Sequence, residues 1–131
     1  MFRIDLRDAV PVWKQIEEGV RRLVGAGVFR PGGAVPSVRD LAKELRVNPM
    51  TVSKAYQRLA DGGVLEIRRG AGTFVASGPP PMSRGEKART LRGAASRYVA
   101  VAMTLAVSKD EAKREVATAW DETMRSAGGE R

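Results

Sequence analysis

Three consecutive prolines, Pro79-Pro80-Pro81, divide this chain of 131 residues into two parts. Proline fixes its own φ angle and supplies no amide donor, so neither a helix nor a strand pairing continues through such a run. Residues 1–77 combine helix and strand patterns, whereas residues 78–131 have the pattern of helices alone. The proline run therefore predicts two domains, residues 1–77 and residues 78–131, the second of which begins with a linker.

The composition limits the chemistry open to the chain. It contains no cysteine and no histidine, which excludes disulfides, thiolate nucleophiles, histidine acid–base catalysis and the usual Cys/His zinc sites. Lys and Arg number 23 against 15 Asp and Glu, a net charge of +8, and this balance favours a polyanionic partner, most often a nucleic acid. We therefore expect a protein that is not an enzyme and holds no metal or cofactor.

The sequence also predicts where the protein works. Charged residues near the N-terminus, such as Arg3 and Asp5, indicate that no signal peptide is present. The longest apolar stretch, residues 98–107, is too short for a bilayer, which needs about 20 residues. Because no disulfide framework points to secretion, we expect a cytoplasmic protein without a membrane partner.

The first predicted helix covers residues 11–26. Pro11 suits the first helical position, where its missing N–H costs nothing. Apolar residues then recur at steps of three and four, which gives the helix one apolar face. Gly27 fits the left-handed position that follows the last turn.

Two short helices are predicted next. Ser37 is the expected N-cap of a helix of about nine residues. Asn48 is the expected N-cap of the following helix, with Pro49 at its first position, and Gly62-Gly63 ends that helix. Two short helices around a tight turn form a helix-turn-helix.

A β-hairpin is predicted after the second of these helices. Residues 64–67 and 73–76 have strand composition, and the basic, glycine-rich residues 68–72 separate them. A helix, a helix-turn-helix and a hairpin, in that order, make a winged helix.

Two helices are predicted after the prolines. The first covers residues 86–107, and the second begins after Ser108, which forms an S-x-x-E capping box with Glu111. The pair is most simply an antiparallel helical hairpin, and its apolar face is mostly alanine, which allows close helix approach. The expected fold class is thus mostly α with a small β-wing: a winged helix-turn-helix followed by a two-helix C-terminal hairpin.

Several short motifs in residues 7–76 resemble the GntR family of bacterial transcription regulators in order and spacing. The motifs are residues 11–16, Pro31-Gly32, residues 35–42, residues 47–52, Ala55-Tyr56 and residues 70–75. The remainder resembles the small YtrA-type branch, which carries only a two-helix dimerisation hairpin. The resemblance implies a sequence-specific DNA-binding transcription regulator, a repressor that acts as a homodimer on a palindromic operator. Nothing in the sequence identifies a small-molecule effector.

The resemblance also implies which residues contact DNA: the Pro-Ser-x-Arg motif, the start of the third helix and the wing tip. The predicted DNA-binding residues are Ser37, Arg39, Asn48, Pro49, Met50, Thr51, Ser53, Lys54, Arg68, Arg69 and Gly70. The apolar face of the last two helices is assigned to dimerisation through Leu91, Ala95, Tyr98, Ala102, Leu105, Val116 and Trp120.

Simpler explanations exist for several of these residues. Capping alone would explain Asn48, and Arg39 would be an ordinary surface arginine if it paired with Asp40 or Glu44. Met50 would either pack on a thymine methyl group or simply be exposed. The competing function is a non-specific architectural nucleic-acid-binding protein, which would use the wing without any sequence preference.

Overall fold

The computed structural model describes the backbone of residues 1–78 and 82–129, and the side chains of residues 1–78 and 82–125. The predicted proline linker, Pro79-Pro80-Pro81, lies outside the described residues. Residues 1–78 belong to one compact unit, and residues 82–126 form a second. The described residues contain five helices and one two-stranded antiparallel sheet, so the predicted fold class is confirmed.

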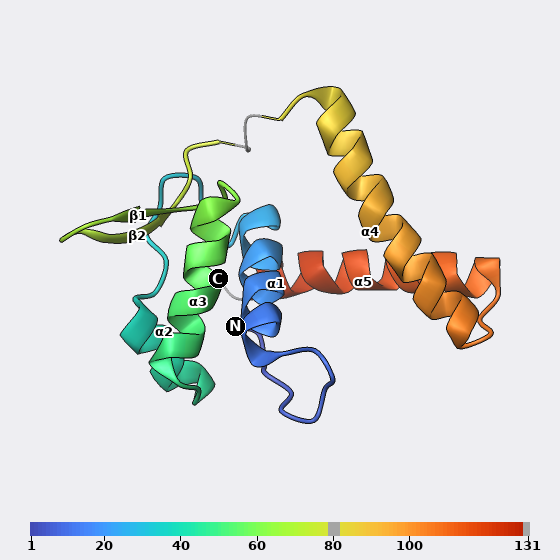
Figure 1. Ribbon diagram of the computed structural model, residues 1–131, viewed down its shortest axis with the longest axis horizontal. Helices are drawn as coiled ribbons and strands as arrows, with labels where there is room; N and C mark the ends of the chain where they lie inside the picture. The colour runs from blue at the N-terminus through green and yellow to red at the C-terminus, as the bar shows by residue number, and fades with distance from the viewer. Residues whose placement is uncertain (79–81, 130–131) are drawn as a thin grey trace. The chain divides into compact units, whose positions relative to one another are not determined.

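The first unit is built around one central helix. Its elements are α1 (Val12–Gly25), α2 (Val38–Leu45), α3 (Pro49–Asp61), β1 (Leu65–Arg68) and β2 (Gly72–Val75). Helix α3 packs against α1, α2 and β1. In Figure 1, α1 lies on one side of α3, and α2 and the hairpin lie on the other. This is the winged helix-turn-helix that the sequence predicts.

Side-chain caps define the helix-turn-helix. The Ser37 hydroxyl accepts a hydrogen bond from the backbone N–H of Asp40 (3.0 Å), and the Asn48 side-chain oxygen accepts one from the backbone N–H of Met50 (2.8 Å). Both predicted N-caps are confirmed. Between the helices, Arg46 adopts the left-handed conformation (φ 57°), which ends α2 and turns the chain toward α3.

The predicted start of the first helix is wrong by one position. Pro11 is the N-cap of α1 rather than its first helical residue, because its ψ of 147° is extended. Its carbonyl accepts hydrogen bonds from the N–H groups of Lys14 (3.0 Å) and Gln15 (3.1 Å). At the other end Gly27 has φ 81°, as its predicted left-handed role requires.

The hairpin is also displaced by one residue from its predicted strands. Leu65 pairs with Val75 and Arg68 pairs with Gly72, so Arg68 belongs to a strand rather than to the tip. The turn closes through a hydrogen bond from the Ala71 N–H to the Arg68 carbonyl (3.1 Å). Gly70 within this turn has φ 77°, a conformation that favours glycine.

The core of the first unit lies between the three helices and the hairpin. Its largest fully buried side chains are Tyr56, Ile16, Leu41, Leu59, Val20 and Val52. The Tyr56 hydroxyl donates a hydrogen bond to the Pro36 carbonyl (2.7 Å), which ties α3 to the segment before α2. Burial raises the pKa of the Tyr56 phenol, so the group keeps the proton that this bond needs.

The second unit contains α4 (Arg84–Thr104) and most of α5 (Lys109–Gly129). Helix α4 starts two residues earlier than predicted because the Ser83 hydroxyl accepts a hydrogen bond from the Glu86 N–H (3.1 Å). It also ends earlier, since Ala106 turns left-handed (φ 56°). The predicted Ser108 cap is confirmed by its hydrogen bond from the Glu111 N–H (3.2 Å).

The two helices do not pack together along their length. No residue of α4 is buried, and α5 diverges from α4 beyond the turn instead of running along it (Figure 1). Near the turn, the Tyr98 hydroxyl donates to the Ala112 carbonyl (2.7 Å). An apolar cleft of about 440 Å³ opens between the helices there. Alanine removes the steric obstacle to close packing but adds little apolar area to drive it.

None of the helices among the described residues combines the length and the apolar character that crossing a membrane requires.

Candidate nucleic-acid interface

The start of α3 presents the side chains predicted to read DNA. Val52, Ala55, Tyr56 and Leu59 of this helix are buried in the core, and the residues between them face outward. Met50 is 79% exposed, and Ser53 and Lys54 are exposed as well. Pro49 is exposed at the first helical position, while Thr51 is only half-buried. An exposed methionine at a helix start suits contact with a thymine methyl group.

Arg39 and Ser37 lie at the start of α2. Arg39 is exposed and, within the part of the chain that the structure describes, forms no ion pair or hydrogen bond. The simpler explanation of Arg39, a pairing with Asp40 or Glu44, is therefore not seen. Ser37 accepts the Asp40 amide as a cap, which leaves its own hydroxyl hydrogen available for a phosphate oxygen.

Asn48 has the structural role that capping alone would give it. Its side-chain oxygen is engaged by the Met50 N–H. The side-chain amide still has two donors, and the residue is exposed. A contact between Asn48 and DNA stays a prediction.

The two arginines of the wing have different surroundings. The Arg68 guanidinium lies 4.2 Å from the ring centroid of Phe74 and forms an ion pair with Glu66 (3.4 Å). Arg69 is exposed beside Gly70 in the turn and has no such partner among the described residues. Arg69 is thus the less restrained arginine, and the absence of a Cβ on Gly70 permits close backbone approach to DNA.

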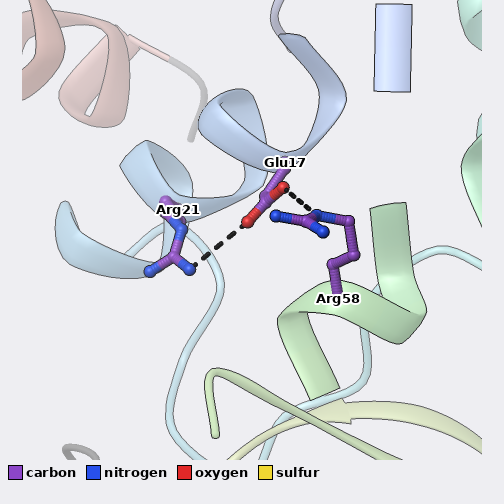
Figure 2. A network of polar contacts seen from close by, with 3 residues as sticks. All are labelled: Glu17, Arg21 and Arg58. Atoms are coloured by element: carbon purple, nitrogen blue, oxygen red, sulfur yellow. Dashed lines mark hydrogen bonds and ion pairs between the residues drawn. The ribbon is translucent and has the colours of Figure 1, made fainter. Parts of the chain in front are cut away.

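A polar network that the sequence analysis missed joins α1 to α3. Glu17 is the one charged residue that is buried among those the structure describes. One of its oxygens pairs with Arg58 Nε (3.1 Å) and the other with Arg21 Nη2 (3.4 Å), as Figure 2 shows. A buried carboxylate needs such partners, because an unpaired one would be very costly.

Trp13 extends this network toward the start of α3. Its ring lies 4.6 Å from Lys54 Nζ and 4.6 Å from Arg58 Cζ. The sequence contains one signal for this arrangement: Trp13 and Glu17 are four residues apart, as are Lys54 and Arg58. Such pairs lie on one face of their helices, but only the packing of α1 on α3 brings the two faces together.

The described part of the chain offers no cluster of three or more metal-ligating side chains. What the interface offers is cations, hydrogen-bond donors and one exposed thioether. That set suits binding to phosphates and base edges rather than bond-making chemistry.

The residues assigned to dimerisation belong to the second unit. Leu91 is 73% exposed, Leu105 67% and Trp120 70%. Val116 is half exposed, and Tyr98 is 38% exposed. Ala95 is exposed too, while Ala102 is half-buried. A single chain therefore leaves these apolar side chains largely in water.

Sequence comparisons give the interface a context. Residues 13–75 match the family model described as bacterial regulatory proteins, gntR family. The chain is 42% identical to the HTH-type transcriptional repressor YtrA of Bacillus subtilis over 76 residues, which cover 58% of this chain and 58% of that protein. It is 34% identical over 113 residues to the HTH-type transcriptional regulator Rv1152 of Mycobacterium tuberculosis, covering 86% of this chain and 88% of that protein. The match spans little more than half of YtrA but most of Rv1152.

Solved structures share the fold. A transcriptional antiterminator from Listeria monocytogenes has a TM-score of 0.81 at 29% identity, covering 95% of this chain and 92% of its own. YtrA from Sulfolobus acidocaldarius, a GntR-family transcription factor, has a TM-score of 0.55 at 31% identity, covering 92% and 97%. The DNA-binding domain of AraR, solved in complex with operator ORE1, has a TM-score of 0.52 at 28% identity, covering 58% and 95%.

Proposed function

Since this chain belongs to the GntR family of bacterial regulatory proteins, which are DNA-binding transcription regulators rather than enzymes, we propose that it is a cytoplasmic repressor that binds a palindromic operator as a homodimer. The observation that supports this most is the exposed start of α3, where Met50, Ser53 and Lys54 face away from the core. A helix start of this kind fits the major groove.

The proposed interface divides the work among three places. Lys54 and the Ser37 hydroxyl supply phosphate contacts, which give affinity independent of sequence. Arg39 binds a guanine edge through its bidentate fork. Met50 and Ser53 face base edges in the major groove. Arg69 enters the minor groove beside Gly70, because a narrow minor groove attracts arginine.

The proposed homodimer follows from the second unit. Leu91, Leu105 and Trp120 are too exposed to be stabilised within one chain, and a second copy would remove them from water. Two copies related by twofold symmetry would place their α3 helices on two half-sites, which makes the operator palindromic. Such a complex represses transcription when the operator overlaps a promoter.

Selection of bound sequences from a random DNA pool tests this function. A palindromic consensus with two half-sites is the expected result. Recovery without any sequence preference would instead identify an architectural nucleic-acid-binding protein. A consensus with one half-site would contradict the homodimer.

Arg39→Ala is expected to weaken operator binding by about 1–3 kcal/mol, because a bidentate contact from arginine to guanine contributes about that much. Fluorescence anisotropy with operator and random duplexes measures the loss. Equal losses on both duplexes would restrict Arg39 to a phosphate. Unchanged affinity for both would remove Arg39 from the interface.

Replacement of Arg68 and Arg69 by Ala is expected to flatten the dependence of log K on log salt by about 0.9 for each phosphate that the variant no longer binds. Arg69→Ala alone should give most of the change, because Arg68 already has Glu66 and Phe74 as partners. Arg22→Ala, which removes an exposed arginine near the end of α1, is the matched control. An unaltered slope and affinity would make the wing an ordinary surface hairpin.

A further inference from the structure

The two cations on the outer part of α3 face the same indole but have different partners. Lys54 Nζ and Arg58 Cζ each lie 4.6 Å from the Trp13 ring centroid. Arg58 also pairs with the buried carboxylate of Glu17 at 3.1 Å. Among the described residues, Lys54 pairs with no carboxylate, so the indole is its one partner.

This difference decides which cation remains free to bind an anion. The carboxylate of Glu17, which also pairs with Arg21, offsets part of the charge of Arg58 and occupies its Nε donor. The indole attracts the Lys54 ammonium through its quadrupole and leaves the full positive charge in place. A lysine side chain loses rotamer freedom when it binds a phosphate, and a contact that orders it beforehand reduces that loss.

We propose that Trp13 is a positioning residue for DNA binding: its indole holds the Lys54 ammonium ready for a backbone phosphate, while Glu17 keeps Arg58 out of the interface. The inference rests on the proposed function, because it assumes that the start of α3 binds DNA. It adds that a residue of α1 acts on DNA through Lys54, and that only one of the two neighbouring cations forms a phosphate contact.

A double-mutant cycle with Trp13→Leu and Lys54→Ala tests the first part. The probes are the duplex selected from the random pool and an unrelated duplex of equal length. Trp13→Leu alone should weaken binding to both duplexes about 2- to 5-fold, which is the free energy of a cation–π contact at an exposed site expressed as a ratio of affinities. In the Lys54→Ala background, Trp13→Leu should have almost no further effect. Trp13→Tyr should retain most of the affinity, since a tyrosine ring also attracts cations.

Salt dependence tests the second part. Lys54→Ala should reduce the slope of log K against log salt by about 0.9, which corresponds to one phosphate contact. Arg58→Gln, which can still donate a hydrogen bond to Glu17, should leave the slope unchanged. Thermal unfolding of every variant ensures that binding is compared between folded proteins.

Each contrary outcome is distinct. Additive effects of Trp13→Leu and Lys54→Ala would mean that Trp13 acts through packing or its own DNA contact, and would overturn the positioning role. A lower slope for Arg58→Gln would place Arg58 on a phosphate and overturn the assignment of Glu17. If Trp13→Leu unfolds, the same cycle with Trp13→Phe decides, with a smaller expected loss. A wild-type protein that binds neither duplex would refute the proposed function itself.

Discussion

Ending the chain at Met82 is expected to lower operator affinity about 10²- to 10⁴-fold, because linking two binding modules typically raises avidity by that factor. The truncated protein lacks α4 and α5, which contain the exposed apolar side chains assigned to dimerisation. It should stay folded, since every buried core residue that the structure describes lies between Ile16 and Val75. Sedimentation should show a monomer, and affinity for an isolated half-site should hardly change.

Two results would contradict this prediction. A truncated protein that remains dimeric would place the interface within residues 1–82. A truncated protein that unfolds would show that both units form one cooperative domain. A matched control restores dimerisation artificially by joining the truncated chain to an unrelated dimeric coiled coil. Operator affinity should then recover substantially.

Leu59→Ala is expected to reduce the free energy of unfolding by about 2–5 kcal/mol, the usual cost of a cavity left by a buried leucine. Leu59 is 0% exposed and lies on the face of α3 that packs into the core. Urea unfolding followed by circular dichroism measures the change. Because α3 also presents the proposed DNA contacts, binding should weaken only where the variant begins to unfold.

Leu6→Ala serves as the control for this substitution. Leu6 is 77% exposed, so the same chemical change should alter stability by less than about 0.5 kcal/mol. Similar losses for both leucines would contradict the placement of the core around α3.

Local signals in the sequence were enough to predict the winged helix-turn-helix. Ser37, Asn48 and Ser108 each satisfy orphan N–H groups at a helix start, and this chemistry depends only on neighbouring residues. The apolar period of α3 likewise predicts its buried face. The Ser83 hydroxyl caps α4 in the same way through the Glu86 N–H, and this cap was not predicted.

Features that depend on tertiary contacts could not be predicted. The strand limits follow from the pairing of Arg68 with Gly72, which composition does not determine. The contacts of Trp13 with Lys54 and Arg58 need the packing of α1 on α3. The divergence of α4 and α5 was missed because an alanine-rich face permits packing within a chain or between chains. The pattern does not distinguish these cases.

The division of α3 into two faces has a consequence for how proteins of this kind diversify. Val52, Ala55 and Leu59 hold the helix in the core, whereas Met50, Ser53 and Lys54 are exposed. Surface substitutions of this sort usually change stability little. Mutations at the exposed positions can therefore accumulate without a folding penalty, so a gene duplicate can acquire a new DNA target while it inherits an intact scaffold.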